Sequence, residues 1–344
     1  MILVIKAIGV SQFLPTSHPD CFAECYLRPP SLGARDLQVR VRAVSVNPID
    51  CKVRASVQER LMTPRILGWD VAGVVTAVGE QVTLFSPGDE VYYAGSITRP
   101  GCNSEYHVVD ERIVGRKPRN LSFEEAAALP LTTITAWEAL FEQLAVSAEP
   151  DGNQKSTILI IGGAGGVGSM AIQLANYAGL RVIATASREV SKRWCLRMGA
   201  ADCVNHHGDL KAELANRGIQ AVDYILCLNN TDHYWPLMAE MVKPQGKICA
   251  VVSTKQAPDL NLLKNKSATF TWEFMFTKAM YETSDMISQH QLLNRVADVV
   301  EQGAVKTTMT EHLGVLNAAN LAKAHQRLES GRMVGKLVLS GIVS

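Results

Sequence analysis

The feature that most limits what this chain can fold into is a glycine-rich turn between two strand patterns. Residues 157–161 (Thr-Ile-Leu-Ile-Ile) predict a buried strand, and they lead directly into residues 162–168 (Gly-Gly-Ala-Gly-Gly-Val-Gly). An amphipathic helix pattern follows, and then a second strand at 181–186. A glycine turn inside a strand–helix–strand unit of about 30 residues is typical of dinucleotide-binding folds. We therefore predict a Rossmann domain with a doubly wound parallel sheet.

The same turn predicts how the phosphates of a dinucleotide would be held. Its residues fit G-x-G-x-x-G and enter the helix in the order Gly163, Gly165, Gly166, Val167 and Gly168. Glycines permit a close approach of the backbone to a pyrophosphate, and the helix N-terminus offers N–H donors and a partial positive charge. A glycine turn with no ligand would use the same residues. The flanking strand and helix favour the cofactor site.

The end of the second strand indicates which dinucleotide is bound. An NAD-binding unit usually places Asp or Glu there to hold the ribose 2′-hydroxyl. This chain has Ser187 and Arg188 instead, with Lys192 one turn later. A hydroxyl and two cations suit a 2′-phosphate, so we predict NADPH. The alternative is that Arg188 and Lys192 are solvated charges at a helix start, with Glu189 weakening their field.

The rest of the chain predicts a second domain. At 344 residues the chain is long enough for about two domains. Strand patterns at 37–45, 70–78 and 90–94 indicate a β-rich region, which ends at a capping box, Ser122 to Glu125. Beyond the glycine turn, strand patterns recur among helices at 202–204, 224–227, 247–252 and 268–272. The tail from Met286 carries two helix patterns and one strand, 336–339.

Composition excludes several kinds of partner. Lys and Arg number 34 against 33 Asp and Glu, so no basic excess is available for nucleic acid. No apolar run reaches the roughly 18 residues of a membrane span. The 8 cysteines contain no CxxC pair, which favours reduced thiols in the cytoplasm. We therefore expect a cytoplasmic protein whose partners are neither nucleic acid nor membrane.

Several short motifs occur together in one order along the chain. They are Asn47-Pro-x-Asp50, Leu67-Gly-x-Asp-x-Ala-Gly73, Pro87-Gly-Asp89, Leu129-Pro-x-Thr-x-x-Thr-Ala136, the glycine turn and Gly335-Lys-x-Val338. In these motifs the chain resembles the medium-chain dehydrogenase/reductases, in their quinone oxidoreductase-like branch. Trp272–Phe276 and Thr310–Leu313 resemble the subgroup of zinc-type alcohol dehydrogenase-like proteins.

This resemblance implies a fold and an assembly. The fold would be α/β, with a GroES-like β-rich catalytic domain formed by 1–128 and 277–344. A Rossmann NADP-binding domain, 129–276, would interrupt it. The resemblance also implies a homodimer, formed by edge pairing near Ala268–Trp272.

The resemblance further implies roles for individual residues. Asn47 and Asp50 would lie on the β-domain side of an active-site cleft and, with Lys52, are the expected catalytic residues. Asn47 and Lys52 are the candidate groups for a hydrogen bond to the acceptor oxygen. Thr135 would lie near the nicotinamide, and His206 would lie where relatives stack an aromatic ring on adenine. Lys52 occupies a position where many quinone reductases carry Tyr. It could stabilise a developing enolate, or it could simply point to solvent, and both interpretations remain open.

The resemblance to zinc-type proteins does not extend to the zinc ligands. Zinc-dependent relatives have Cys where this chain has Asn47, and Gly-His-Glu where it has Gly68-Trp69-Asp70. They also have a Cys in the region of Leu131–Thr133, and four cysteines in a structural lobe where only Cys102 is present here. Amide and carboxylate oxygens are poor substitutes for the soft ligands of a catalytic zinc. We expect no intrinsic metal.

Together these observations favour one function over two others. The leading hypothesis is an NADPH-dependent oxidoreductase that transfers hydride to a quinone or an α,β-unsaturated carbonyl. Such acceptors are already polarised by conjugation, so their reduction depends less on a Lewis acid, and we expect no catalytic metal. The alternatives are a zinc-dependent alcohol dehydrogenase, and an NADPH-binding protein with a structural or sensory role.

Overall fold

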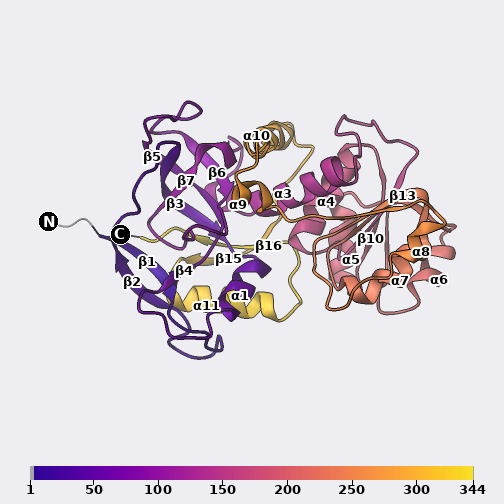
Figure 1. Ribbon diagram of the computed structural model, residues 1–344, viewed down its shortest axis with the longest axis horizontal. Helices are drawn as coiled ribbons and strands as arrows, with labels where there is room; N and C mark the ends of the chain where they lie inside the picture. The colour runs from indigo at the N-terminus through magenta and orange to yellow at the C-terminus, as the bar shows by residue number, and fades with distance from the viewer. Residues whose placement is uncertain (1–3, 344) are drawn as a thin grey trace. The chain divides into compact units, whose positions relative to one another are not determined.

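The computed structural model describes residues 4–343 and divides into two compact units (Figure 1). Unit 1 comprises Met1–Leu131, Phe276–Gly303 and Thr307–Ser344, and unit 2 comprises Thr132–Met275 and Ala304–Lys306. The expected domain boundaries, 128/129 and 276/277, lie within three residues of these divisions, and 304–306 had been expected in the other domain. Residues 1–3 and 344 of the expected catalytic domain lie outside the described residues.

Unit 1 is built mainly from antiparallel strands. Its strands are β1 (Ile5–Val10), β2 (Ala23–Leu27), β3 (Asp36–Ser45), β4 (Arg65–Ile66), β5 (Asp70–Val78), β6 (Glu90–Ala94), β7 (Tyr106–Asp110), β8 (Val114–Arg116), β15 (Met309–Val315) and β16 (Lys336–Ser340). Its helices are α1 (Pro48–Ala55), η1 (Glu111–Ile113), α2 (Phe123–Ala127), α9 (Thr277–Tyr281), α10 (Ser288–Glu301) and α11 (Ala318–Glu329).

The larger sheet of unit 1 brings three distant segments together. Its order is β15-β16-β3-β5-β6-β8, with β7 also paired to β3. β3 is antiparallel to both neighbours, with Ser45 opposite Val338 on β16 and opposite Asp70 on β5. Continuing this register two residues beyond Ser45 places Asn47 opposite Lys336. The carboxyl end of β3 therefore meets the first residues of β5 and β16.

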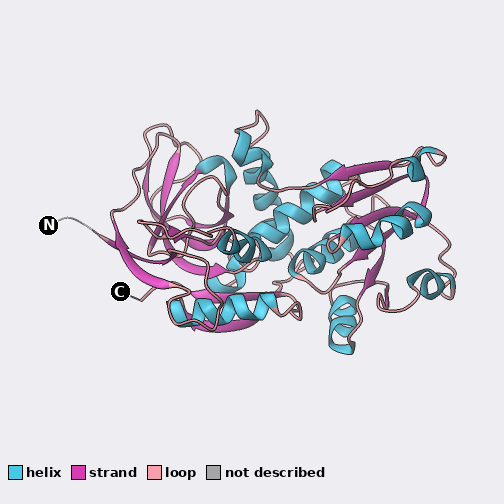
Figure 2. Ribbon diagram, turned by 60° about the horizontal axis from the view of Figure 1, so that its bottom comes forward, coloured by secondary structure: helices cyan, strands magenta, loops and turns pink. Residues whose placement is uncertain are grey.

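Unit 2 is a parallel sheet flanked by helices (Figure 2). Its strands are β9 (Thr157–Ile161), β10 (Arg181–Thr185), β11 (Asp202–Val204), β12 (Val222–Cys227), β13 (Val242–Ala250) and β14 (Thr269–Trp272). Their order is β11-β10-β9-β12-β13-β14, which is the doubly wound arrangement of a Rossmann fold. Its helices are η2 (Glu138–Gln143), α4 (Gly166–Tyr177), α5 (Glu189–Arg197), α6 (Leu210–Ala215), α7 (Thr231–Met241) and α8 (Asn261–Lys264), and α3 (Pro130–Trp137) begins in unit 1.

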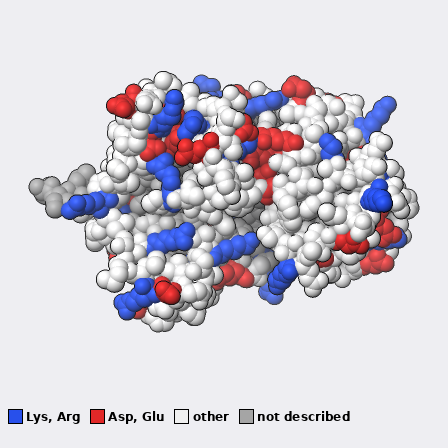
Figure 3. Space-filling view, viewed as in Figure 1, with Lys and Arg blue, Asp and Glu red and all other residues white. Residues whose placement is uncertain are grey.

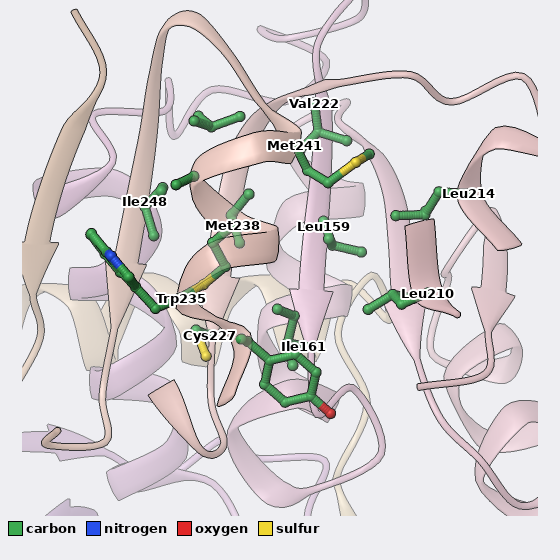
Figure 4. Close-up of a cluster of buried hydrophobic side chains, with 14 of the residues drawn as sticks. Leu159, Ile161, Leu210, Leu214, Val222, Cys227, Trp235, Met238, Met241 and Ile248 are labelled. Atoms are coloured by element: carbon green, nitrogen blue, oxygen red, sulfur yellow. The ribbon is translucent and has the colours of Figure 1, made fainter. Parts of the chain in front are cut away.

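The core of unit 2 packs helix α7 and helix α6 against one face of this sheet. Trp235 and Met238 of α7 meet sheet residues such as Ile248, and Leu214 of α6 packs in the same cluster as Leu159 (Figure 4). Each fully buried side chain of this kind contributes about 1.5–3 kcal/mol relative to exposure. The same sheet carries the glycine turn, so a rigid core supports that turn.

The prediction of a single strand in the tail from Met286 was wrong, because the tail contains two strands. β15 lies parallel to β16 and was not predicted. The sequence of residues 131–144 has a helix pattern, which corresponds to α3 and its continuation as the π-helical η2. The strand expected at 247–252 is β13, which begins earlier, at Val242.

The surface shows no region of one dominant charge on the face in Figure 3, where acidic and basic side chains are interspersed. Among residues 4–343, no helix is long and apolar enough to cross a membrane.

Candidate functional site

A buried polar cluster lies where β3, β5 and β16 meet in unit 1. The Lys336 ammonium donates hydrogen bonds to Asn47 Oδ1, to Asp70 Oδ2 at 3.1 Å and to the Val46 carbonyl at 3.0 Å. Asn47 Nδ2 in turn donates to Asp70 Oδ2 at 2.7 Å. Lys336 is 4% exposed, Asn47 1% and Asp70 0%. We name Lys336, Asn47 and Asp70 the lysine cluster.

The lysine cluster limits what the Asn47 side chain can do. Its Oδ1 accepts from Lys336, and its Nδ2 contacts Asp70 and, at 3.5 Å, the Ser45 carbonyl. Asp70 is equally committed, since its Oδ1 accepts the Leu131 N–H at 2.7 Å. Asn47 therefore holds the ends of three strands together. The sequence had placed Lys336 in a family motif but had assigned it no contact.

Asp50 joins the same region through helix α1. Pro48 starts this helix, a position where its missing N–H costs nothing, and the Asp50 carboxylate accepts the N–H of Asn47, the N-cap residue, at 2.5 Å. Burial raises the pKa of Asp50 to about 7; the Asn47 N–H and the Lys336 charge lower it, and Asp70 raises it. Asp50 therefore holds a proton for much of the time near neutral pH.

This raised pKa predicts how stability varies with pH. Between the unfolded value, 3.8, and about 7, the folded protein keeps a proton that the unfolded chain has released. Stability from this group is therefore complete below pH 4 and is lost as pH rises through 7. We expect Asp50→Asn to reduce the drop in unfolding free energy between pH 5 and pH 8 by about 2–3 kcal/mol.

Urea unfolding at the two pH values measures this difference. Asp20→Asn is the control, because the Asp20 side chain is 83% exposed. An Asp50→Asn protein with the same pH dependence as the wild type would show that burial does not perturb this carboxyl.

Two further sequence-predicted residues, Lys52 and Thr135, differ in exposure. Lys52 lies on α1, two residues after Asp50, and is exposed. Its position is compatible with both interpretations given above. Thr135 is buried in α3, within unit 2.

The glycine turn of unit 2 has the shape that the motif predicts. Gly165 is the N-cap of α4, and Gly166, Val167 and Gly168 form its first turn. A Cβ added at Gly168 would lie 2.4 Å from the Gly162 carbonyl oxygen, so this glycine allows the helix to pack on the strand. At Gly165 the nearest such atom is 3.7 Å away, which leaves the backbone open to a ligand. The N–H groups at this helix start suit an anion.

The predicted 2′-phosphate residues follow β10, the neighbour of β9. Ser187 is half-buried, Arg188 is the exposed N-cap residue of α5, and Lys192 is half-buried on the first turn of that helix. His206 follows β11, the next strand in the sheet, and is half-buried against His207. These residues therefore all follow the carboxyl ends of adjacent parallel strands, where ligands bind in such sheets.

Comparison with known proteins identifies the family to which this chain belongs. An alcohol dehydrogenase GroES-like domain matches residues 33–119, and a zinc-binding dehydrogenase domain matches 198–339. A zinc-type alcohol dehydrogenase-like protein of Staphylococcus epidermidis is 43% identical over 336 residues, which cover 98% of this chain and 99% of that protein. The chain belongs to the medium-chain dehydrogenase/reductase superfamily. It is an oxidoreductase with a pyridine-nucleotide-binding fold.

Two solved structures show how closely this medium-chain dehydrogenase/reductase matches its relatives. A Rhizobium etli protein, provisionally described as a zinc-dependent alcohol dehydrogenase, has a TM-score of 0.93 and 45% identity, with both chains covered completely. The quinone oxidoreductase of Coxiella burnetii has a TM-score of 0.79 and 27% identity, over 98% of this chain and 99% of that one.

The names of these relatives mention zinc, but the residues of the lysine cluster do not suit a zinc ion. At the two positions where the family resemblance implies Cys and His in a zinc-dependent enzyme, this chain has Asn47 and Trp69. The Trp69 indole is buried and donates to the Ser96 carbonyl at 3.1 Å. The Lys336 ammonium already bonds the Asn47 and Asp70 oxygens, and its charge opposes a divalent cation.

We therefore expect the purified protein to hold no stoichiometric zinc at this cluster. Elemental analysis after dialysis measures it, and activity assays with and without a chelator accompany it. One tightly held zinc per chain, with activity lost on chelation, would contradict the expectation.

A second group of potential metal ligands lies between α1 and α11. One ligand atom each from Cys51, His325 and Glu329 lies within 4.8 Å of the others. The Arg54 guanidinium, 1% exposed, already pairs with Glu329. Burial raises the pKa of the Cys51 thiol to about 12 and lowers that of His325 to about 3. Cys51 Sγ lies 3.4 Å from His325 Nδ1 and Glu329 pairs with Arg54, so these side chains contact one another and bridge the two helices.

Proposed function

We propose that the protein transfers hydride from NADPH to a quinone or an α,β-unsaturated carbonyl without a catalytic metal. The observation that carries this proposal is the lysine cluster, in which an ammonium and hard oxygen atoms replace the ligands of a catalytic zinc. In zinc-dependent alcohol dehydrogenases the metal acts as a Lewis acid that stabilises the alkoxide, so the replacement of its ligands argues against ordinary alcohol oxidation. Conjugated acceptors need less stabilisation. A quinone oxidoreductase among the solved relatives supports this substrate class.

The proposed cofactor site uses the residues of unit 2. The N–H groups at the start of α4 bind the pyrophosphate, and Ser187, Arg188 and Lys192 bind the 2′-phosphate. His206 packs on the adenine. Thr135 lies near the nicotinamide in this proposal. The bound cofactor supplies the hydride, which is its own chemistry.

The proposed substrate residues belong to helix α1. Exposed Lys52 carries a cation able to stabilise the oxyanion that develops on the acceptor after hydride addition. Asn47 and Asp50 act indirectly, because the hydrogen bond from the Asn47 N–H to the Asp50 carboxylate fixes the start of α1. Solvent supplies the proton that completes the reduction.

The test is NADPH oxidation with a panel of quinones and enones, with and without chelator, beside NADP⁺ reduction with simple alcohols. The proposal requires turnover of conjugated acceptors that chelator does not affect. Alcohol oxidation abolished by chelator would favour a zinc-dependent alcohol dehydrogenase. Tight NADPH binding without turnover of any acceptor would favour a structural or sensory role.

We also propose that two copies associate through β14. This strand ends the sheet order of unit 2, and Trp272 on it is 43% exposed. An exposed apolar edge strand readily pairs with another strand. Analytical ultracentrifugation at micromolar concentration should give twice the 37.4 kDa chain mass, and a monomer would exclude the proposal.

A further inference from the structure

Trp194 connects helix α5 to the helix that begins at the glycine turn. Its indole Nε1–H donates to Ser169 Oγ at 2.7 Å, and the Ser169 hydroxyl donates to the Gly165 carbonyl at 2.7 Å. Ser169 is 0% exposed and Trp194 is 7% exposed. One hydroxyl thus accepts from α5 and donates to the turn, which uses its single proton fully.

The next residue on α5 contacts the same turn by packing. A Cβ added at Gly163 would lie 3.1 Å from Cys195 Sγ and 2.8 Å from Ala184 Cβ. No larger side chain fits at Gly163 without moving these neighbours. Helix α5 therefore rests directly on the turn, and its distance from the turn is narrowly defined.

The strand before α5 is tied to the turn as well. Thr185, the last residue of β10, accepts the Gly162 N–H on its Oγ1 at 3.0 Å and the Gly163 N–H on its carbonyl at 3.1 Å. Ser187, Arg188 and Lys192 lie between Thr185 and Trp194 in the chain. The segment that carries them is therefore attached to the glycine turn at both ends.

From this arrangement we infer that Trp194 is a positioning residue for cofactor selectivity. The inference rests on the proposed use of NADPH. The pyrophosphate and the 2′-phosphate belong to one molecule, so the turn and the cations on α5 must keep a fixed separation. Hydrogen bonds weaken steeply with distance and angle, so a displaced α5 would lose contacts to the 2′-phosphate. NADH has no 2′-phosphate and depends less on this separation.

The test compares Trp194→Phe with wild type. Phenylalanine keeps an aromatic ring in the core but removes the N–H. We expect the Kd for NADPH to rise about threefold to tenfold, as for the loss of one neutral hydrogen bond. The Kd for NADH should change less than twofold, and kcat at saturating NADPH should stay within twofold.

Trp235→Phe is the matched control. Trp235 lies on helix α7 and is also buried in unit 2. Its Nε1–H donates a hydrogen bond to the Asp259 carbonyl at 3.2 Å. It should leave the ratio of the two dissociation constants unchanged. Ser169→Ala provides a second route to the same loss, and the double variant Ser169→Ala/Trp194→Phe should be no worse than the weaker-binding single variant.

The outcomes separate this inference from the proposed function. The positioning role would be overturned if Trp194→Phe lowered the affinities for NADPH and NADH equally. It would also be overturned if the ratio of the NADH Kd to the NADPH Kd stayed within twofold of the wild-type ratio. An equal loss of selectivity in Trp235→Phe would do the same. If wild type itself binds both dinucleotides equally, the proposed NADPH preference fails, and the selectivity role of Trp194 fails with it.

Discussion

Replacing Lys336 with methionine is expected to lower the free energy of unfolding by about 3–5 kcal/mol, the usual cost of removing one partner from a buried ion pair. Methionine fills much of the same volume, so the loss comes mainly from charge and hydrogen bonding. Without the ammonium, Asp70 loses a cation at 3.1 Å, and Asn47 Oδ1 and the Val46 carbonyl lose a donor. Urea unfolding at pH 7 measures the change.

Two further variants show whether the uncompensated charge is responsible. Asp70→Asn/Lys336→Met removes both charges and should recover part of the lost stability, because no unpaired charge is then buried. Lys117→Met is a control at another buried lysine, whose acidic partner Glu90 has a side chain 52% exposed. It should cost less, since Glu90 can be solvated. A loss below about 1 kcal/mol for Lys336→Met, the range of an exposed pair, would show that the pair contributes little.

The parallel sheet was predictable because its strands are buried on both faces. Residues 158–161 (Ile-Leu-Ile-Ile) form an uninterrupted apolar run that ends at the glycine turn, and this run lies in β9. β15 gave no such signal. Its residues are half-buried or exposed, and its sequence Met-Thr-Glu-His-Leu-Gly-Val does not alternate cleanly. Among residues 4–343 it pairs with β16 alone, at the end of the sheet. A strand at the edge of a sheet needs no continuous apolar face, so the pattern does not reveal it.

Two further differences between the sequence pattern and the structure, the early start of β13 and the π-helical turn of η2, lie in irregular backbone. In β13, Pro244 has no N–H to donate, and Gln245 has a φ of 62°, a conformation that favours glycine. The pairing with β12 is interrupted between Val222 and Tyr224 as a result. The π-helical η2 has the sequence Glu-Ala-Leu-Phe-Glu-Gln, which is compatible with an ordinary α-helix, so the sequence pattern does not reveal the wider turn.

The candidate site was predictable only in part. The glycine turn is contiguous, so its residues could be identified from spacing. The lysine cluster joins residues 47, 70 and 336, and their contact depends on the pairing of β3 with β5 and β16. The hydrogen bond of Trp194 to Ser169 likewise joins two helices, and no local pattern distinguishes it from ordinary packing. For Lys336 the sequence offered two signals, its place in the motif Gly335-Lys-x-Val338 and its charge in an otherwise apolar strand pattern at 336–339, and neither one identified its partners.

The largest expected effect on binding follows from Arg188, which starts α5 in an extended conformation. A 2′-phosphate carries close to two negative charges near neutral pH, and a charge-assisted hydrogen bond from Arg contributes about 1.5–3 kcal/mol. NADPH should therefore bind wild type about one to two orders of magnitude more tightly than NADH. Arg188→Ala should weaken NADPH at least tenfold and leave NADH nearly unchanged, as measured by fluorescence titration.

Salt dependence and a neighbouring arginine distinguish a direct contact from a general field. Arg188→Ala should also reduce the sensitivity of NADPH binding to salt. Salt weakens an ionic contact by screening it, so a protein without that contact loses less affinity when salt is added. Arg193→Ala on the same helix changes the net charge equally, but Arg193 is exposed and lies 3.7 Å from Glu189, one turn away. It should weaken NADPH less than twofold. If wild type binds both dinucleotides equally, or if Arg188→Ala weakens both alike, Ser187, Arg188 and Lys192 do not form a phosphate site.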